Sequence, residues 1–103
     1  MEQERRRSPR FPFIASAEVL EENNGSQLSA CVSDISATGC YVDTINPLPG
    51  GTPVRVKIFN ETQSFEASAT VAYSVVHLGM GLSFGEVPPR SRDVLRQWLP
   101  AGV

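Results

Sequence analysis

Apolar and polar residues alternate with a period of two along most of the chain, which is the pattern of strands with one buried face. The clearest case is Val54, Val56 and Ile58, which alternate with Arg55 and Lys57. Five other segments show this alternation or a short apolar run, at about residues 13–19, 26–34, 40–42, 65–73 and 79–84. We therefore expect about six short strands.

The longest alternation runs through residues 65–73. Every second residue in it is apolar or aromatic: Phe65, Ala67, Ala69, Val71 and Tyr73. Because side chains of a strand point to opposite faces in turn, we expect all five to share one face.

Turn-forming residues separate these segments. The sequence Asn-Asn-Gly at residues 23–25 contains Asn-Gly, the strongest short signal for a hairpin. Residues 47–53 hold three prolines and two glycines, which no regular element tolerates, and residues 60–62 form another polar turn. The strands should therefore be joined by short connections.

A helix is expected near the C-terminus, over about residues 88–99. Pro88 and Pro89 end the last strand and suit the first turn of a helix, with Asp93 close to its start. Its apolar residues fall on one helical face: Val94, Leu95, Trp98 and Leu99. The pattern predicts a mainly β fold, a small six-stranded antiparallel β-barrel with a C-terminal α-helix.

The chain of 103 residues has the length of one domain, and its charges are unevenly distributed. Residues 1–10 carry four arginines against two glutamates, whereas the remainder carries five basic and nine acidic residues. We expect residues 1–12 to form a flexible arginine-rich arm and residues 13–103 to form the barrel with its helix.

The acidic body argues against polymeric nucleic acid as a partner, since such binding needs a basic face spread over many phosphates. The longest apolar runs are far short of the ~20 residues that cross a bilayer, and the charged N-terminus does not resemble a signal peptide. We expect a cytoplasmic protein without membrane insertion.

The cysteines and the histidine predict neither a metal site nor catalysis. Cys31, Cys40 and the single histidine, His77, lack the spacing of a zinc site. We expect two reduced thiols, and a disulfide between Cys31 and Cys40 is the alternative. Without an activated nucleophile and its base, we do not expect an enzyme.

A first candidate site lies in the arm, where Arg6 and Arg10 are four residues apart and Arg5 precedes them. In an extended chain the pair spans roughly 13 Å on one side, which suits a ligand of dinucleotide size. Guanidinium groups bind phosphate or guanine edges bidentately and stack on bases. On composition alone, a solvated basic tail explains these arginines equally well.

A second candidate lies between two expected strands, where Asp34, Ser36 and Gly39 form the pattern D-x-S-x-x-G. A carboxylate can accept hydrogen bonds from guanine, a hydroxyl can bind phosphate or base, and glycine allows close approach of backbone. The same residue types are common in a plain turn, where Gly39 would supply a positive φ.

Together, these features resemble the PilZ domain family. The resemblance rests on three segments in the family's order, residues 4–10 (ERRRSPR), 34–39 (DISATG) and 79–84 (GMGLSF), and covers nearly the whole chain. It implies a six-stranded barrel with a C-terminal helix that binds cyclic di-GMP, a bacterial second messenger, and needs no cofactor. A downstream protein partner of unknown identity is also implied.

The resemblance also implies roles for individual residues. Arg6 and Arg10 would hold guanine edges and phosphates, with Arg5 adding charge and stacking beside them. Asp34, Ser36 and Gly39 would complete the pocket from the barrel.

The alternative is a ligand-independent protein-interaction domain of the same fold, in which the apolar stripe of the helix docks a partner instead of the barrel.

Overall fold

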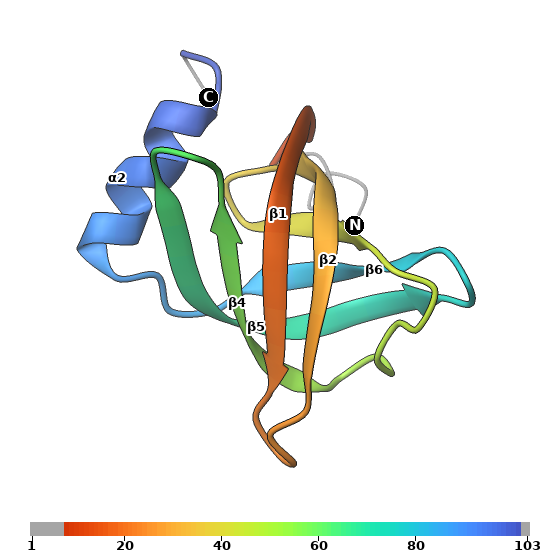
Figure 1. Ribbon diagram of the computed structural model, residues 1–103. Helices are drawn as coiled ribbons and strands as arrows, with labels where there is room; N and C mark the ends of the chain where they lie inside the picture. The colour runs from red at the N-terminus through yellow and green to blue at the C-terminus, as the bar shows by residue number, and fades with distance from the viewer. Residues whose placement is uncertain (1–7, 102–103) are drawn as a thin grey trace.

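The computed structural model describes residues 8–101, so Arg5 and Arg6 lie outside the described residues. Within this range six strands precede one helix (Figure 1). The elements are β1 (Phe11–Glu21), β2 (Gln27–Ile35), β3 (Gly39–Asp43), β4 (Pro53–Phe59), β5 (Ser64–Val75), β6 (Gly79–Phe84) and α2 (Pro89–Trp98). The mainly β prediction, with a C-terminal helix, is confirmed.

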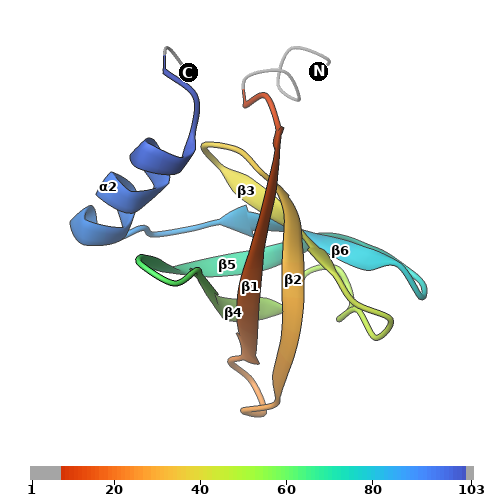
Figure 2. The same ribbon diagram turned by 45° about the horizontal axis from the view of Figure 1, so that its top comes forward.

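The strands close into a barrel in the order β1-β2-β3-β6-β5-β4, and β4 pairs with β1 to complete it. All six pairings are antiparallel. Figure 2 shows the helix lying outside the wall, beside β5, so it does not fill the interior. Closure leaves no long strand edge open to another chain.

The interior is filled by the apolar side of each alternation. Val54, Val56 and Ile58 of β4 are at most 1% exposed, and Phe65 of β5 is fully buried. The ring of Phe65 lies 4.9 Å from that of Phe84, measured between centroids, and 6.4 Å from that of Trp98. Valine, isoleucine and phenylalanine side chains, together with smaller residues such as Ala17 and Ala67, thus form the core expected from the pattern.

The helix packs its apolar stripe on the barrel. Leu95 is buried, and Val94, Trp98 and Leu99 pack partly buried against the core. Trp98 also donates a hydrogen bond from Nε1 to Gln63, and its ring lies 4.7 Å from that of Phe13. The stripe is therefore engaged within the domain.

Some predicted boundaries shift by one to three residues. Strand β1 begins at Phe11, and α2 begins at Pro89, with no acidic residue in its first turn. Asp93 therefore lies too far along the helix to act on its N-terminus, and it pairs with Arg96 at 3.1 Å. The Asn-Gly hairpin is confirmed, with Gly25 at a φ of 76°.

The prediction that Tyr73 shares one face of its strand with Phe65 and Val71 is wrong. Val71 pairs with Leu82 and Tyr73 with the next residue, Gly81, so Ala72 is an extra residue in β5. Such a β-bulge reverses the alternation from that point, because two residues now oppose one. Tyr73 consequently points outward and is 42% exposed.

Both cysteines are free: Cys31 is exposed and Cys40 is buried. Burial raises the pKa of the Cys40 thiol to about 12, with the negative charge of Asp34 adding to the effect.

No helix in residues 8–101 is long and apolar enough to span a membrane.

The buried core makes Phe65 a sensitive position. Phe65→Ala should lower the free energy of unfolding by about 3–5 kcal/mol, since it leaves a cavity beneath Phe84 and Trp98. Ile14→Ala is the control, because Ile14 is 78% exposed, and it should change stability by less than about 0.5 kcal/mol. Urea denaturation measures both, and equal losses would contradict this assignment of the core.

The two thiols should differ in reactivity. The native protein at pH 8 should react with a thiol reagent at Cys31 only, because Cys40 is buried and stays protonated. Unfolding in denaturant should release the second thiol. Prompt modification of both thiols in the folded protein would mean that Cys40 is accessible.

Candidate functional site

The described residues of the two motifs meet on the outer face of the barrel. Arg10 directly precedes β1, Asp34 lies near the end of β2, Ser36 belongs to the β2–β3 connection, and Gly39 is the first residue of β3. Arg10, Ser36 and Gly39 line one pocket of about 330 Å³, and Asp34 is bonded to Arg10 beside it. The positions of Arg5 and Arg6 are not described.

Arg10 and Asp34 form an ion pair, in which Nη1 lies 3.2 Å from Oδ1 and 3.5 Å from Oδ2. Burial alone would lower the pKa of Arg10, but Tyr73 and Asp34 raise it overall, and the guanidinium stays charged. The side chains of Arg10 and Asp34 keep 44% and 29% of their surface exposed. Both therefore remain open to a ligand from solvent.

The β2–β3 turn is held by Ser36, which is buried. Its hydroxyl accepts hydrogen bonds from the amides of Thr38 and Gly39, at 3.2 and 3.1 Å, and donates one to the carbonyl of Gly39. The Ser36 amide also donates to that carbonyl, at 2.8 Å. These bonds fix the shape of the pocket wall.

Gly39 is required by close packing. Its φ is not positive, so the expectation of a left-handed turn residue at this position is wrong. A Cβ at Gly39 would instead overlap the backbone carbonyl of Leu82 in the neighbouring strand β6. The glycine lets β3 and β6 pair beside the pocket.

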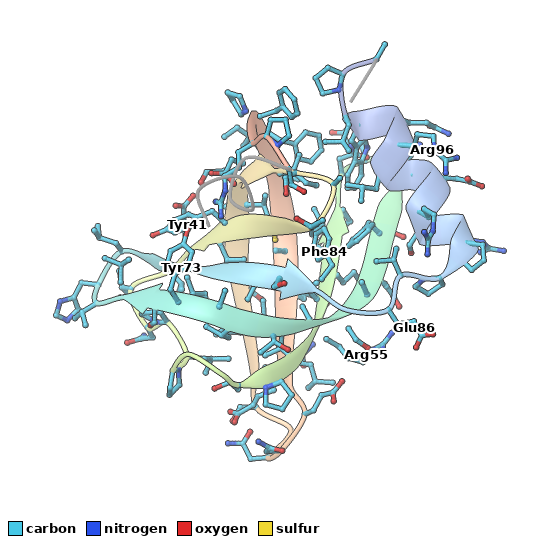
Figure 3. All side chains as sticks on the ribbon, turned by 180° about the vertical axis from the view of Figure 1, so that it is seen from behind. Tyr41, Arg55, Tyr73, Phe84, Glu86 and Arg96 are labelled. Atoms are coloured by element: carbon cyan, nitrogen blue, oxygen red, sulfur yellow. The ribbon has the colours of Figure 1, made fainter. Side chains whose placement is uncertain are left out.

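Two tyrosines that the sequence analysis did not select also belong to this face. Asp34 is paired with Tyr41 of β3, Tyr41 with Gly81 of β6, and Gly81 with Tyr73 of β5. The four residues form one row across four strands. Figure 3 shows the two labelled rings next to each other, with centroids 6.2 Å apart.

A register shift sets the direction of side chains at both ends of this row. In β2, Ser33 is an extra residue between Val32, which is buried, and Asp34, which is exposed in part. In β5, Ala72 is likewise an extra residue between Val71, which is buried, and Tyr73, which is exposed. Bulges commonly occur next to binding sites because they redirect side chains in this way.

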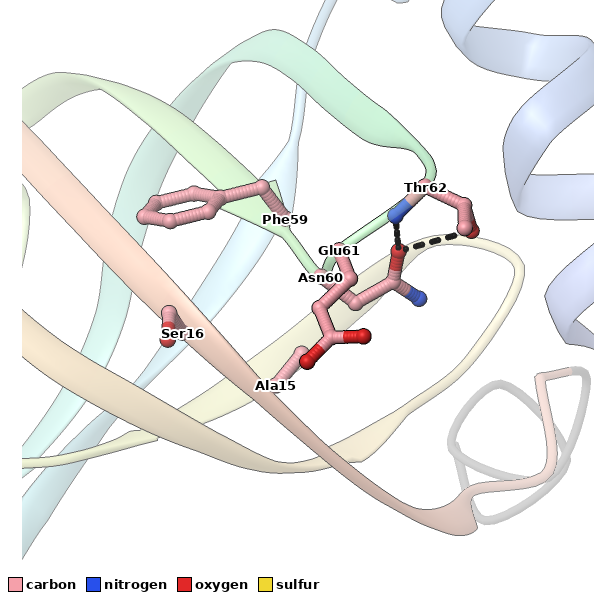
Figure 4. A pocket seen from close by; sticks show the side chains of 6 residues that line it. All are labelled: Ala15, Ser16, Phe59, Asn60, Glu61 and Thr62. Atoms are coloured by element: carbon pink, nitrogen blue, oxygen red, sulfur yellow. Dashed lines mark hydrogen bonds between the residues drawn. The ribbon is translucent and has the colours of Figure 1, made fainter.

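A larger hollow of about 470 Å³ lies elsewhere, over β1 and the β4–β5 turn (Figure 4). It is lined by Ala15, Ser16, Phe59, Asn60, Glu61 and Thr62. Its one charged lining residue is an acid, and Asn60 Oδ1 is engaged by the amide and hydroxyl of Thr62. This surface suits an anionic ligand poorly.

No group of three or more His, Cys, Asp or Glu side chains within residues 8–101 is placed to hold a metal ion. The chemistry on the outer face is therefore that of a guanidinium, a carboxylate, turn amides and two aromatic rings.

The sequence matches the model of one known protein family. The model of the PilZ domain matches residues 4–100 of the chain. A search among curated protein sequences finds no significant match.

Three solved structures share the fold. The PilZ domain of CeSA from a cellulose-synthesizing bacterium is 18% identical, with a TM-score of 0.66 over 88% of this chain and 95% of that one. The PilZ domain of YcgR from Escherichia coli, solved with c-di-GMP, is 16% identical, with a TM-score of 0.71 over 90% and 87%. The Bacillus subtilis inhibitor of motility MotI/DgrA is 19% identical, with a TM-score of 0.71 over 88% of this chain and 47% of that one.

The close packing at Gly39 predicts a large effect of one methyl group. Gly39→Ala should destabilise the fold by about 1–3 kcal/mol, because β3 and β6 must separate beside the pocket. Gly85→Ala is the matched control, since a Cβ there meets Ser68 only at ordinary contact distance. Thermal unfolding compares the two variants, and equal stability would refute the packing argument.

Proposed function

Because the chain belongs to the PilZ domain family, we propose that it is a receptor for cyclic di-GMP that binds this ligand between the arginine arm and the outer face of the barrel. The observation that carries the proposal is the meeting of Arg10 and Asp34 beside a pocket walled by the Ser36–Gly39 turn. A fixed charge and a carboxylate that both remain partly exposed suit a ligand with phosphates and guanines.

Cyclic di-GMP carries two phosphates, which are anionic, and two guanines, which present both donors and acceptors. In the proposal Arg10 binds a phosphate or the O6 and N7 atoms of a guanine, for which its fork geometry is suited. Arg6 and Arg5 are proposed to add the same chemistry from the arm. Gly39 and Ser36 contribute by shaping the wall on which the ligand rests.

Asp34 is proposed to select guanine. The Watson–Crick edge of guanine offers two N–H donors side by side, and an ionised carboxylate is an acceptor only. Adenine lacks this pair of donors at the same edge. Asp34 therefore favours guanine over adenine.

The ion pair between Arg10 and Asp34 is compatible with this role. Exposed pairs contribute only about 0.2–1 kcal/mol, so a ligand can reorganise this one at small cost. Charge-assisted bonds to phosphate are stronger than neutral ones and can exceed that cost. The pair holds Arg10 near the pocket before the ligand arrives.

The output is proposed to be a changed surface. We assign residues 1–12 as the arm that closes on the ligand and residues 13–103 as the barrel that receives it. Arm, ligand and barrel rim together would present a surface that a downstream protein recognises, in the cytoplasm. Binding can drive such a switch only through different affinities for the two states of the arm.

Removal of the arginines tests the binding site. Arg10→Ala should weaken cyclic di-GMP binding by roughly tenfold or more, the equivalent of one charge-assisted contact, and Arg6→Ala/Arg10→Ala should abolish it. Calorimetry measures both. Arg96→Ala is the control because it also breaks an exposed Arg–Asp pair, but on the helix. Parent affinity in Arg10→Ala would contradict the assignment.

Substitution of Asp34 tests base selection. Asp34→Ala should weaken cyclic di-GMP more than cyclic di-AMP, narrowing the preference for guanine, while Asp93→Ala should leave both affinities unchanged. If both nucleotides lose affinity by the same factor in Asp34→Ala, then Asp34 does not contact the base edge.

A further inference from the structure

The two tyrosines of the row lie flat against strand β6 because two glycines make room for them. A Cβ on Gly81 would overlap the ring of Tyr73. A Cβ on Gly79 would overlap the backbone carbonyl of Val42 and come within 2.8 Å of two ring carbons of Tyr41. Both glycines belong to the segment G-M-G-L that opens β6. The two aromatic side chains therefore pack against the backbone of this segment.

The outer side of Tyr73 is open. Although its ring covers Gly81, the residue is 42% exposed. Tyr41, which pairs with Asp34, is half-buried and supports Tyr73 from the side. The tilt between the rings is 32°, so they form a slightly bent platform.

This platform borders the proposed ligand pocket directly. Tyr73 and Gly81 line it together with Arg10 and Gly39. Tyr73 also lies close enough to Arg10 to be one of the groups that raise the pKa of Arg10. An exposed ring next to a guanidinium is where a planar base could stack while its phosphate stays near the charge.

We infer that the ring of Tyr73 is a stacking face for a guanine base of the bound dinucleotide, with Tyr41 as the positioning residue that holds it in place. The inference rests on the proposed function and extends it to Tyr73, which belongs neither to the arginine motif of the arm nor to the D-x-S-x-x-G motif. Base–aromatic stacking needs only a π face, so the ring contributes to affinity and Asp34 contributes to selectivity.

A purely structural role for Tyr73 makes different predictions. Aromatic side chains that cover glycines stabilise sheets, and an apolar aliphatic side chain would also shield Gly81 from water. A role through the hydroxyl, acting on Arg10, would be lost in Tyr73→Phe. Stacking alone depends on the ring and not on the hydroxyl.

Four variants separate these roles by calorimetric titration with cyclic di-GMP. Tyr73→Phe and Tyr73→Trp should bind within about threefold of the parent, because both keep an aromatic face. Tyr73→Leu and Tyr73→Ala should bind roughly 5- to 150-fold more weakly, the range of a lost base–aromatic stack. Val76→Ala, at a site 73% exposed in the β5–β6 turn, is the control and should bind like the parent.

The outcomes are distinct. Parent-like binding by Tyr73→Leu, with its fold confirmed by thermal unfolding, would overturn the inference, and a loss in Tyr73→Phe as large as in Tyr73→Ala would assign the effect to the hydroxyl instead. If the parent itself does not bind, or if Arg10→Ala binds equally well, the proposed function fails. Binding that depends on Arg10 but not on Tyr73 removes only the stacking inference.

Discussion

The closed barrel imposes one constraint on everything else in this molecule: each strand residue must face either the packed interior or solvent. Six antiparallel strands leave no open edge, and the interior is filled by side chains such as Phe65, Ile58 and Val19, all fully buried. Within residues 8–101 the interior is thus occupied by packed core side chains. Any binding site must therefore be built on the outer wall, from residues whose direction is set by strand register.

Register shifts shape the candidate site on that wall. Extra residues at Ser33 and Ala72 turn Asp34 and Tyr73 outward, and the glycines of β3 and β6 allow close approach where bulky residues would keep the strands or rings apart. The buried hydroxyl of Ser36 then fixes the connecting turn. In β2 the chain returns to the core after the bulge, at Ile35, whereas in β5 all four residues from Ala72 to Val75 are exposed.

The sequence predicted the strands, the helix and the Asp34–Gly39 turn because each rests on local signals: alternation, turn residues and helical spacing. It did not predict Tyr73 as an exposed residue. The bulge adds one small residue, Ala72, and nothing in the pattern of apolar and polar residues marks that residue as an insertion. The pairing of Arg10 with Asp34 spans 24 residues and depends on how β1 docks on β2. The reason for Gly39 was likewise invisible, because the carbonyl of Leu82 that it accommodates belongs to a distant segment.

We propose that one outer face of the barrel, over β2, β3, β6 and β5, binds the dinucleotide. A ¹H–¹⁵N NMR titration with cyclic di-GMP tests it residue by residue in the intact chain. We expect the largest amide shifts at Asp34, Gly39, Tyr41, Tyr73 and Gly81, and little change around Ser16 and Thr62 on the other hollow. Shifts centred on that second surface, or none at saturating ligand, would contradict it.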